Sequence, residues 1–112
     1  MAHVTHFVGI DIAKHTLEVA VRPTDQQLAL AYDEAGLQQL LRTLPPPETC
    51  LIVVEATGGY QRRVVAELLT AGHLVAVVNP RQVRDFARAH NILAKTDSLD
   101  ARIIARFGEE VQ

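Results

Sequence analysis

The most constraining feature of this 112-residue sequence is the order of its hydrophobic patterns: apolar residues first recur at the spacing of strands and later at the spacing of helices. Residues 6–12 form an apolar run, and apolar residues then alternate with polar ones over 16–22 and 28–32, which is the period of a strand. From residue 33 onward, helical spacing alternates with short apolar runs. Three strands joined by short turns, followed by alternating helices and strands, predict a mixed five-stranded α/β sheet with helices packed on it.

Turn and capping residues mark where the middle elements begin and end. Leucines at helical spacing follow Asp33, a predicted N-cap, and the prolines at 45–47 end that helix. A short buried strand is predicted at 51–54 because its residues are all apolar. The glycine pair at 58–59 then opens a helix that Gly72 closes. The order of elements up to this point is three strands, a helix, a strand and a helix.

The same reasoning predicts one more buried strand and two more helices. The strand covers 74–78, and Asn79 followed by Pro80 begins a helix that runs to about His90. Residues 91–96 are expected to form a loop before the last helix. The residues expected on the inner faces of the second and last helices are Tyr60, Val64, Leu68, Leu99, Ile103 and Phe107. This order of elements is that of the ribonuclease H fold.

Composition narrows the class of protein. With 48% hydrophobic residues, the chain is expected to fold as one globular domain over residues 1–112. Its single cysteine, Cys50, excludes an internal disulfide, fits a reducing compartment and is expected to be buried. No apolar stretch approaches the ~20 residues that cross a bilayer. We therefore expect a cytoplasmic protein with no membrane partner.

Charge is distributed unevenly along the chain. The net charge is −2, but residues 1–60 hold three Lys or Arg against seven Asp or Glu, whereas residues 61–112 hold eight against six. Arg81, Arg84 and Arg88 recur along one predicted helix, and such a basic stripe is typical of nucleic-acid binding. An ordinary solvated helix surface is the alternative interpretation. Scarce aromatic residues argue against gripping single strands by base stacking.

Two carboxylates lie where burial penalises them. Asp11 lies inside the most apolar strand, and Glu55 directly follows the apolar run 51–54. An isolated buried carboxylate is strongly unfavourable unless it is paired or binds a metal. The first strand and the first parallel strand after the meander are neighbours in a sheet of this order, so Asp11 and Glu55 are expected to face one cleft. Ligands of α/β sheets bind at strand ends of this kind.

A second acidic pair begins the last predicted helix. Asp97 and Asp100 are three residues apart, and side chains at this spacing are neighbours on a helix. Four acidic groups suit Mg²⁺ or Mn²⁺, which prefer carboxylate oxygen over nitrogen or sulfur. The alternative is structural: Asp97 caps the helix, Asp100 interacts with the helix dipole, and Glu55 accepts hydrogen bonds from amides near 57–59. That alternative does not account for Asp11.

Four blocks of the sequence resemble the DEDD transposases, which are insertion-sequence enzymes related to a pilin-gene inverting protein, some of them guided by a bridge RNA. The resemblance extends over nearly the whole chain, and the blocks around Glu55 and Asp97 are the specific ones. The matching blocks are Gly9-Ile10-Asp11-Ile12-Ala13-Lys14, Glu55-Ala56-Thr57-Gly58-Gly59-Tyr60, Val78-Asn79-Pro80 and Ala94-Lys95-Thr96-Asp97-Ser98-Leu99-Asp100-Ala101.

The resemblance implies a RuvC-like catalytic domain for DNA transposition in a bacterial or archaeal cell, associated with the nucleoid. It implies that Asp11, Glu55, Asp97 and Asp100 are catalytic ligands of Mg²⁺ or Mn²⁺. The implied partners are DNA, a guide RNA, a C-terminal domain with a serine nucleophile and further copies of the protein. That serine-bearing domain is not contained in this sequence, so we expect the chain alone not to complete strand exchange. Three further residues of the matched blocks are candidates for nucleic-acid binding: Lys14, Lys95 and Thr96.

Three other functions remain open on sequence grounds. A structure-selective nuclease of the Holliday-junction resolvase type would use the same fold and the same acids. A non-catalytic nucleic-acid-binding module would use the acids for structure alone. Actin-like ATPases also begin with a buried strand that ends in Gly-Ile-Asp. Their next loop is rich in glycine for nucleotide phosphates, whereas residues 12–15 here contain none, which argues against nucleotide binding.

Overall fold

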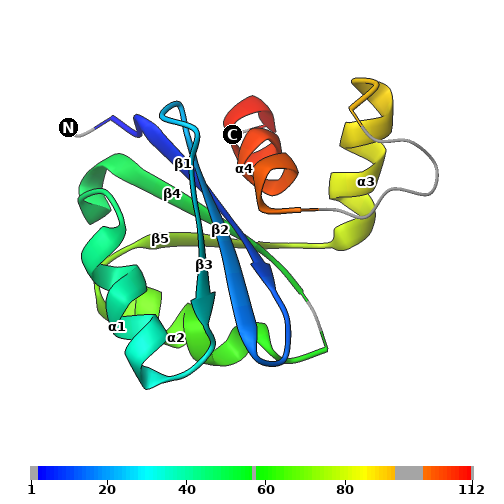
Figure 1. The fold of residues 1–112 in the computed structure, drawn as a ribbon. Helices are drawn as coiled ribbons and strands as arrows, with labels where there is room; N and C mark the ends of the chain where they lie inside the picture. The colour runs from blue at the N-terminus through cyan, green and yellow to red at the C-terminus, as the bar shows by residue number, and fades with distance from the viewer. Residues whose placement is uncertain (1–2, 57, 93–99, 112) are drawn as a thin grey trace.

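The computed structural model describes residues 3–56, 58–92 and 100–111, which form one mixed sheet with helices on both faces (Figure 1). The strands are β1 (His6–Ile12), β2 (Thr16–Arg22), β3 (Gln26–Ala31), β4 (Cys50–Glu55) and β5 (Leu74–Val78). The helices are α1 (Glu34–Thr43), α2 (Gln61–Thr70), α3 (Pro80–Ala89) and α4 (Ala101–Val111), with a short 3₁₀ turn at Pro47–Thr49.

The strand order is β3-β2-β1-β4-β5. Neighbouring strands within the β1–β3 meander are antiparallel, whereas β1, β4 and β5 run parallel to one another. This arrangement confirms the predicted five-stranded, ribonuclease H-like sheet. It also confirms that β1 and β4, the strands that carry Asp11 and Glu55, are neighbours.

The predicted caps account for where two of the helices begin. The amide of Gly36 donates a 2.8 Å hydrogen bond to Asp33, which caps α1 as expected. Asn79 caps α3 through the amide of Arg81 at 2.8 Å, and Gln82 completes a capping box. These caps confirm two of the predicted helix starts to the residue.

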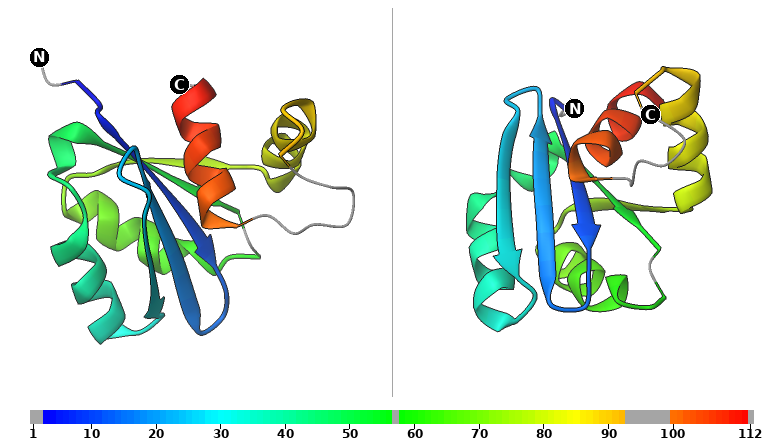
Figure 2. Two further views of the ribbon diagram at one scale, coloured as in Figure 1. Left: turned by 45° about the horizontal axis from the view of Figure 1, so that its top comes forward. Right: turned by 45° about the vertical axis from the view of Figure 1, so that its right-hand side comes forward.

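The sheet separates two layers of helices (Figure 2). Helices α1 and α2 cover one face, where a large aliphatic cluster includes Val8, Ile10 and Ile12 of β1. Helix α4, with α3 beside it, lies on the other face over a smaller cluster of Val53, Val83, Ala87 and Ile104. We call these the aliphatic face and the α4 face.

Helix α4 lies unusually close to β1. A Cβ atom added to Gly9 would overlap the carbonyl oxygen of Ala101 and the amide nitrogen of Ala105, so the helix backbone rests directly on this glycine. At Gly108, an added Cβ would lie 2.6 Å from a methyl group of Val53. The contact therefore depends on small residues, and it places the start of α4 over the middle of β1.

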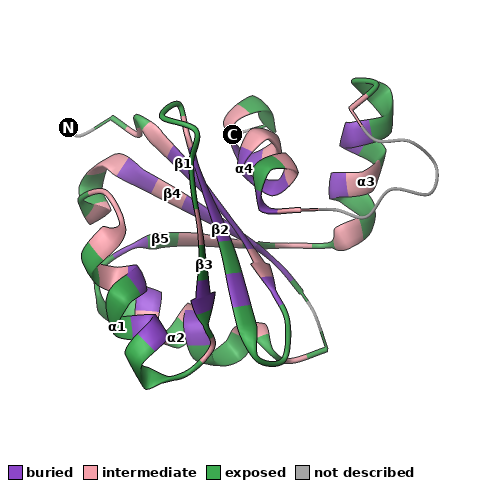
Figure 3. Cartoon of the chain, viewed as in Figure 1, coloured by how far each residue is buried: buried purple, intermediate pink, exposed green. Residues whose placement is uncertain are grey.

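Two sequence predictions of burial were wrong, and a third was confirmed in part. Strand β5 lies at the sheet edge and leaves Leu74 and Val77 about half exposed, at 59% and 49%, because neighbours pair with it on one side only (Figure 3). Tyr60 precedes α2 and is 46% exposed rather than packed beside Val64 and Leu68. The third concerns α4, where Ile103 and Phe107 are partly buried and pack against the cluster of the α4 face as expected. The fully buried residues of this helix are Ala101, Ile104, Ala105 and Gly108.

One further prediction of burial is confirmed. Cys50 is buried, and its burial raises the pKa of the thiol to about 11, as expected for a structural cysteine. In the described residues, no helix is both long enough and apolar enough to cross a membrane. The predicted Leu99 contact and most of the 91–96 loop lie outside the described residues.

Candidate metal centre

Asp11 points toward the α4 face because of its position in β1. Side chains alternate along a strand, and the neighbouring Ile10 and Ile12 belong to the aliphatic face. Asp11 is half-buried and lies directly opposite Glu18 in the register between β1 and β2. The strand that the sequence identified as most apolar therefore presents its single carboxylate to the side covered by α4.

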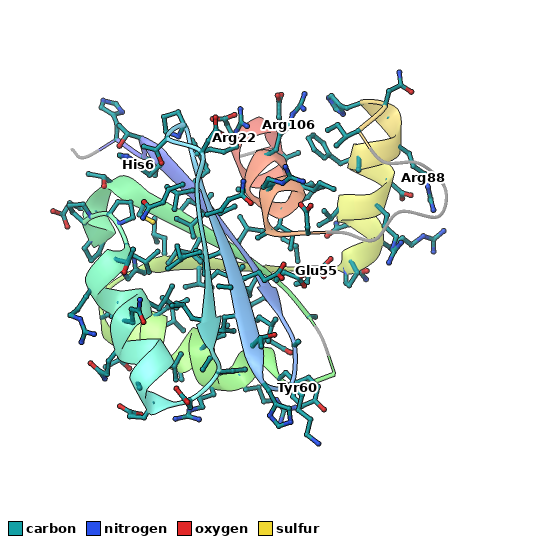
Figure 4. All side chains as sticks on the ribbon, viewed as in Figure 1. His6, Arg22, Glu55, Tyr60, Arg88 and Arg106 are labelled. Atoms are coloured by element: carbon teal, nitrogen blue, oxygen red, sulfur yellow. The ribbon has the colours of Figure 1, made fainter. Side chains whose placement is uncertain are left out.

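Glu55 ends β4 beside Asp11. The register pairs Ile10 with Val54, so Asp11 and Glu55 follow at the next position of two adjacent parallel strands. Glu55 is 6% exposed, and its Oε2 atom has no hydrogen-bond partner among the described residues. Figure 4 shows it between the end of the sheet and the start of α3. A buried polar atom without a partner costs about 1–3 kcal/mol.

The alternative hydrogen bonds expected for Glu55 are not seen in the described loop. The amide of Gly59 donates to Oε1 of Gln61 at 3.1 Å instead. Thr57 lies outside the described residues. The burial of Glu55 thus has no account in the hydrogen bonds of the described loop.

Asp100 is the N-cap of α4. Its Oδ1 accepts a 3.0 Å hydrogen bond from the amide of Ile103, and its carbonyl oxygen accepts one from Ile104 at 3.1 Å. Its Oδ2 lies 3.2 Å from the guanidinium of Arg102. The alternative drawn from the sequence assigned the cap to Asp97 and placed Asp100 in the first helical turn, so this part of it was wrong about Asp100, while Asp97 lies outside the described residues. The cap does not exclude a second role for Asp100, because the close contact at Gly9 brings this end of α4 over β1.

Electrostatics link the three described acids. Burial raises the pKa of Asp11, and the negative charges of Glu18 and Asp100 raise it further. Burial also raises the pKa of Glu55, the charge of Asp11 adds to this rise, and the positive charge of Arg84 opposes it. Asp11 thus interacts with each of the other acids of the group, which favours protonation or a bound cation.

The described residues do not by themselves make up a metal site. Within residues 3–56, 58–92 and 100–111, no three acidic, histidine or cysteine side chains converge closely enough to hold one ion. Asp97, the fourth predicted ligand, lies outside these ranges, as do Lys95 and Thr96. The donors that the structure describes still fit a hard divalent cation. Asp11, Glu55 and Asp100 offer carboxylate oxygens, and one oxygen of Glu55 has no partner in the described part of the chain.

The predicted basic stripe on α3 divides into different environments. Arg81 is exposed, and Arg88 lies 3.7 Å from Asp85 in an exposed ion pair. Arg84 is half-buried and lies close enough to Glu55 to lower the pKa of that carboxyl. Lys14 lies in the turn after β1, away from this stripe. The electrostatic interaction of Arg84 with Glu55 was not anticipated from the sequence.

Glu18 is a further residue of this region that sequence reasoning did not single out. Together with Asp100 and Arg102 it lines a pocket of about 340 Å³ between β2, β3 and the start of α4. The signal for it was present, because a turn centred on Lys14 and His15 pairs Asp11 with Glu18 across the hairpin. A negative side chain opposite Asp11 adds to the repulsion that a cation would relieve.

Comparison with known proteins gives two findings. Residues 8–111 match a protein-family model of DEDD type that is described as a transposase. The chain is also 30% identical over 108 residues to the pilin gene-inverting proteins of Moraxella bovis and Moraxella lacunata. These alignments cover 91% of this chain and 34% of each relative, so the chain spans about a third of their length.

Proposed function

The chain belongs to the DEDD transposase family, and from this premise we propose that Asp11, Glu55, Asp97 and Asp100 form the catalytic metal centre of a DNA transposase domain. The observation that carries the proposal is Glu55: its buried Oε2 has no partner among the described residues, although a neighbouring strand presents Asp11 beside it. A divalent cation would give that oxygen a partner and relieve the repulsion between the acids.

The residues of the centre have separable tasks in this proposal. Asp11 and Glu55 belong to the paired inner strands β1 and β4, and this pairing fixes both carboxylates at the carboxyl ends of these strands. Asp100 is fixed by its cap on α4, which leaves Oδ2 in contact with Arg102, an exposed residue that can release it. Arg84 favours the ionised form of Glu55, the form that binds a cation.

Mg²⁺ or Mn²⁺ bound there would activate a nucleophile and neutralise charge on a DNA phosphodiester. We propose that this chain is the RuvC-like domain of a longer protein whose serine-bearing domain completes strand exchange. The length of the relatives supports this, because the chain covers about a third of each. In this proposal the whole protein acts on DNA in the cytoplasm as an oligomer, with a guide RNA as a further partner.

The test is a titration of Mn²⁺ followed by paramagnetic broadening of the amide NMR spectrum. We expect broadening centred on Asp11, Glu55 and Asp100, and we expect Glu55→Gln to abolish it. Glu110→Gln is the matched control, because Glu110 is exposed near the other end of α4. Equal broadening at exposed carboxylates, or wild-type broadening in the Glu55→Gln variant, contradicts the metal centre.

A cleavage assay on the same protein distinguishes the two candidate functions, a recombinase domain and a resolvase-type nuclease. A branched DNA substrate incubated with Mn²⁺ is expected to remain intact, because strand exchange in this proposal needs the serine-bearing domain. Cleavage that Glu55→Gln abolishes assigns the centre to a nuclease instead.

A further inference from the structure

A second pocket lies at the end of the sheet, beyond the β1–β2 turn, where Figure 4 shows Tyr60. It has a volume of about 290 Å³ and lies between that turn, the end of β3 and the start of α2. Its lining is rich in cationic and aromatic side chains and includes no acidic residue: Lys14, Tyr32, Gly59, Tyr60, Arg62 and Arg63. In a chain with net charge −2, such a cluster is a local exception.

Tyr32 fixes the shape of this pocket. Its hydroxyl donates a short hydrogen bond to the carbonyl oxygen of Tyr60 and accepts one from the amide of Val64 at 3.0 Å. The first turn of α2 is thereby tied to the end of β3. Since Gly59 donates its amide to Gln61, the helix start already has partners for some of its amides. The positive potential of the pocket therefore comes mainly from its side chains.

The three cations differ in how they are neutralised. Arg63 lies 3.4 Å from Glu34 in an exposed ion pair, which is weak in water. Lys14 and Arg62 are exposed, and neither forms an ion pair within the described parts of the chain. Two cationic side chains thus face the same pocket with their charge available to a ligand.

The pocket lies at the same end of the sheet as the candidate metal centre. Lys14 follows Asp11 by three residues, and Gly59 follows Glu55 by four, so both sites lie at the carboxyl ends of β1 and β4. The acids face the α4 face, whereas the pocket lies on the side of α2. Three residues span at most ~10 Å, which is the length of about three nucleotides at ~3.4 Å per nucleotide of a strand.

We propose that this pocket binds a phosphodiester group of the DNA strand whose reacting bond, within about three nucleotides, lies at the carboxylates. The inference rests on the proposed function for the identity of the strand. An arginine guanidinium offers a planar fork of donors that matches phosphate oxygens, and a lysine adds a point charge. Phosphate contacts fix the position of a strand without reading its sequence. The pocket thereby positions the strand for the acidic centre.

The test measures binding of a short fluorescent single-stranded oligodeoxynucleotide by anisotropy, in buffer without divalent metal. The double variant Lys14→Gln/Arg62→Gln is expected to bind about tenfold more weakly and to lower the salt slope by about 1.4, at ~0.7 per lost phosphate contact. Arg42→Gln, which removes an exposed charge in the last turn of α1, is the matched control and is expected to bind as the wild type does.

Each outcome decides the proposal separately from the metal centre. Wild-type affinity in the double variant, an equal loss in the control, or no binding by the wild type overturns the pocket, while Mn²⁺ broadening still judges the carboxylates. An oligoribonucleotide of the same sequence provides the second arm. Equal losses for DNA and RNA support a phosphodiester pocket, whereas a loss confined to RNA overturns its assignment to the DNA strand.

Discussion

The two faces of the sheet are built from different kinds of residue. On the aliphatic face, long branched side chains such as Ile10 and Ile52 of the strands and Leu68 of α2 are fully buried between the sheet and the helices. On the α4 face, Gly9 and Ala105 let a helix approach the strands closely, and the acids Asp11 and Glu55 follow along the same side. The aliphatic face contributes stability by burying large apolar side chains. The α4 face has small residues where the helix approaches the strands, and it carries the charged groups.

This difference indicates which face of a small domain tolerates ionisable side chains. A carboxylate on the aliphatic face would be surrounded by hydrocarbon and remain unpaired, at a cost of several kcal/mol. On the α4 face, Asp11 stays partly exposed and lies opposite Glu18, which lines a pocket with Asp100, so the charge of Asp11 is only partly desolvated. The fold can therefore place its acids on the α4 face while the aliphatic face stabilises the domain.

The largest expected effect is on the aliphatic face. Leu68→Ala is expected to lower the free energy of unfolding by about 2–5 kcal/mol, because Leu68 is fully buried and the change leaves a cavity. Urea denaturation followed by circular dichroism measures this. Its neighbour Leu69 is 55% exposed, so Leu69→Ala is the matched control and should change stability by less than about 0.5 kcal/mol. Similar losses in both variants contradict the stated division between the faces.

The next effect tests the close approach of α4. Gly9→Ala is expected to cost about 1–3 kcal/mol, because its new methyl group meets the backbone of Ala101 and Ala105. It should also weaken Mn²⁺ binding, since displacement of α4 moves Asp100 away from Asp11. Gly108→Ala meets a side-chain methyl of Val53 at 2.6 Å and should cost less. Unchanged Mn²⁺ broadening in a folded Gly9→Ala protein would show that α4 does not position the acids.

Local signals made most of the fold predictable from sequence. Asp33 and Asn79 marked helix starts to the residue, because a side-chain cap acts within three residues of itself. The order of strands followed from short turns and parallel crossovers. The burial of β5 was mispredicted because an apolar run looks the same at a sheet edge as at its centre. Which strand lies at the edge depends on pairing across the whole chain.

The candidate site was predictable to a lesser extent. Asp11 and Glu55 stood out because each interrupts an apolar run, and the structure places them on neighbouring strands. The interaction of Arg84 with Glu55 depends on how α3 packs, which helical spacing alone does not specify. The pocket at Lys14 and Arg62 joins a turn to a helix start 48 positions later, so no local pattern revealed it. The metal ligand role of the four acids stays a prediction.

The smallest effect concerns the charge of Asp11. Its folded pKa is raised above the ordinary value of 3.8, so the folded protein takes up a proton more readily than the unfolded chain. The carboxyl therefore lowers stability as pH rises from about 3.8 through the folded pKa, and its cost is fully present above that folded pKa. Asp11→Asn should raise metal-free stability at neutral pH by at most about 1 kcal/mol, because solvent screens a partly exposed group.

The measurement is the difference in unfolding free energy between wild type and Asp11→Asn across pH, with Asp85→Asn as the matched control at an exposed site. Taking a difference matters because burial lowers the pKa of His73, so acid below about 6.5 destabilises both proteins alike. Added Mn²⁺ should reverse the sign, since only the wild type keeps all its carboxylate donors. A variant that is less stable than the wild type at neutral pH without metal would mean that Asp11 serves the fold, and the two faces would then differ in composition but not in purpose.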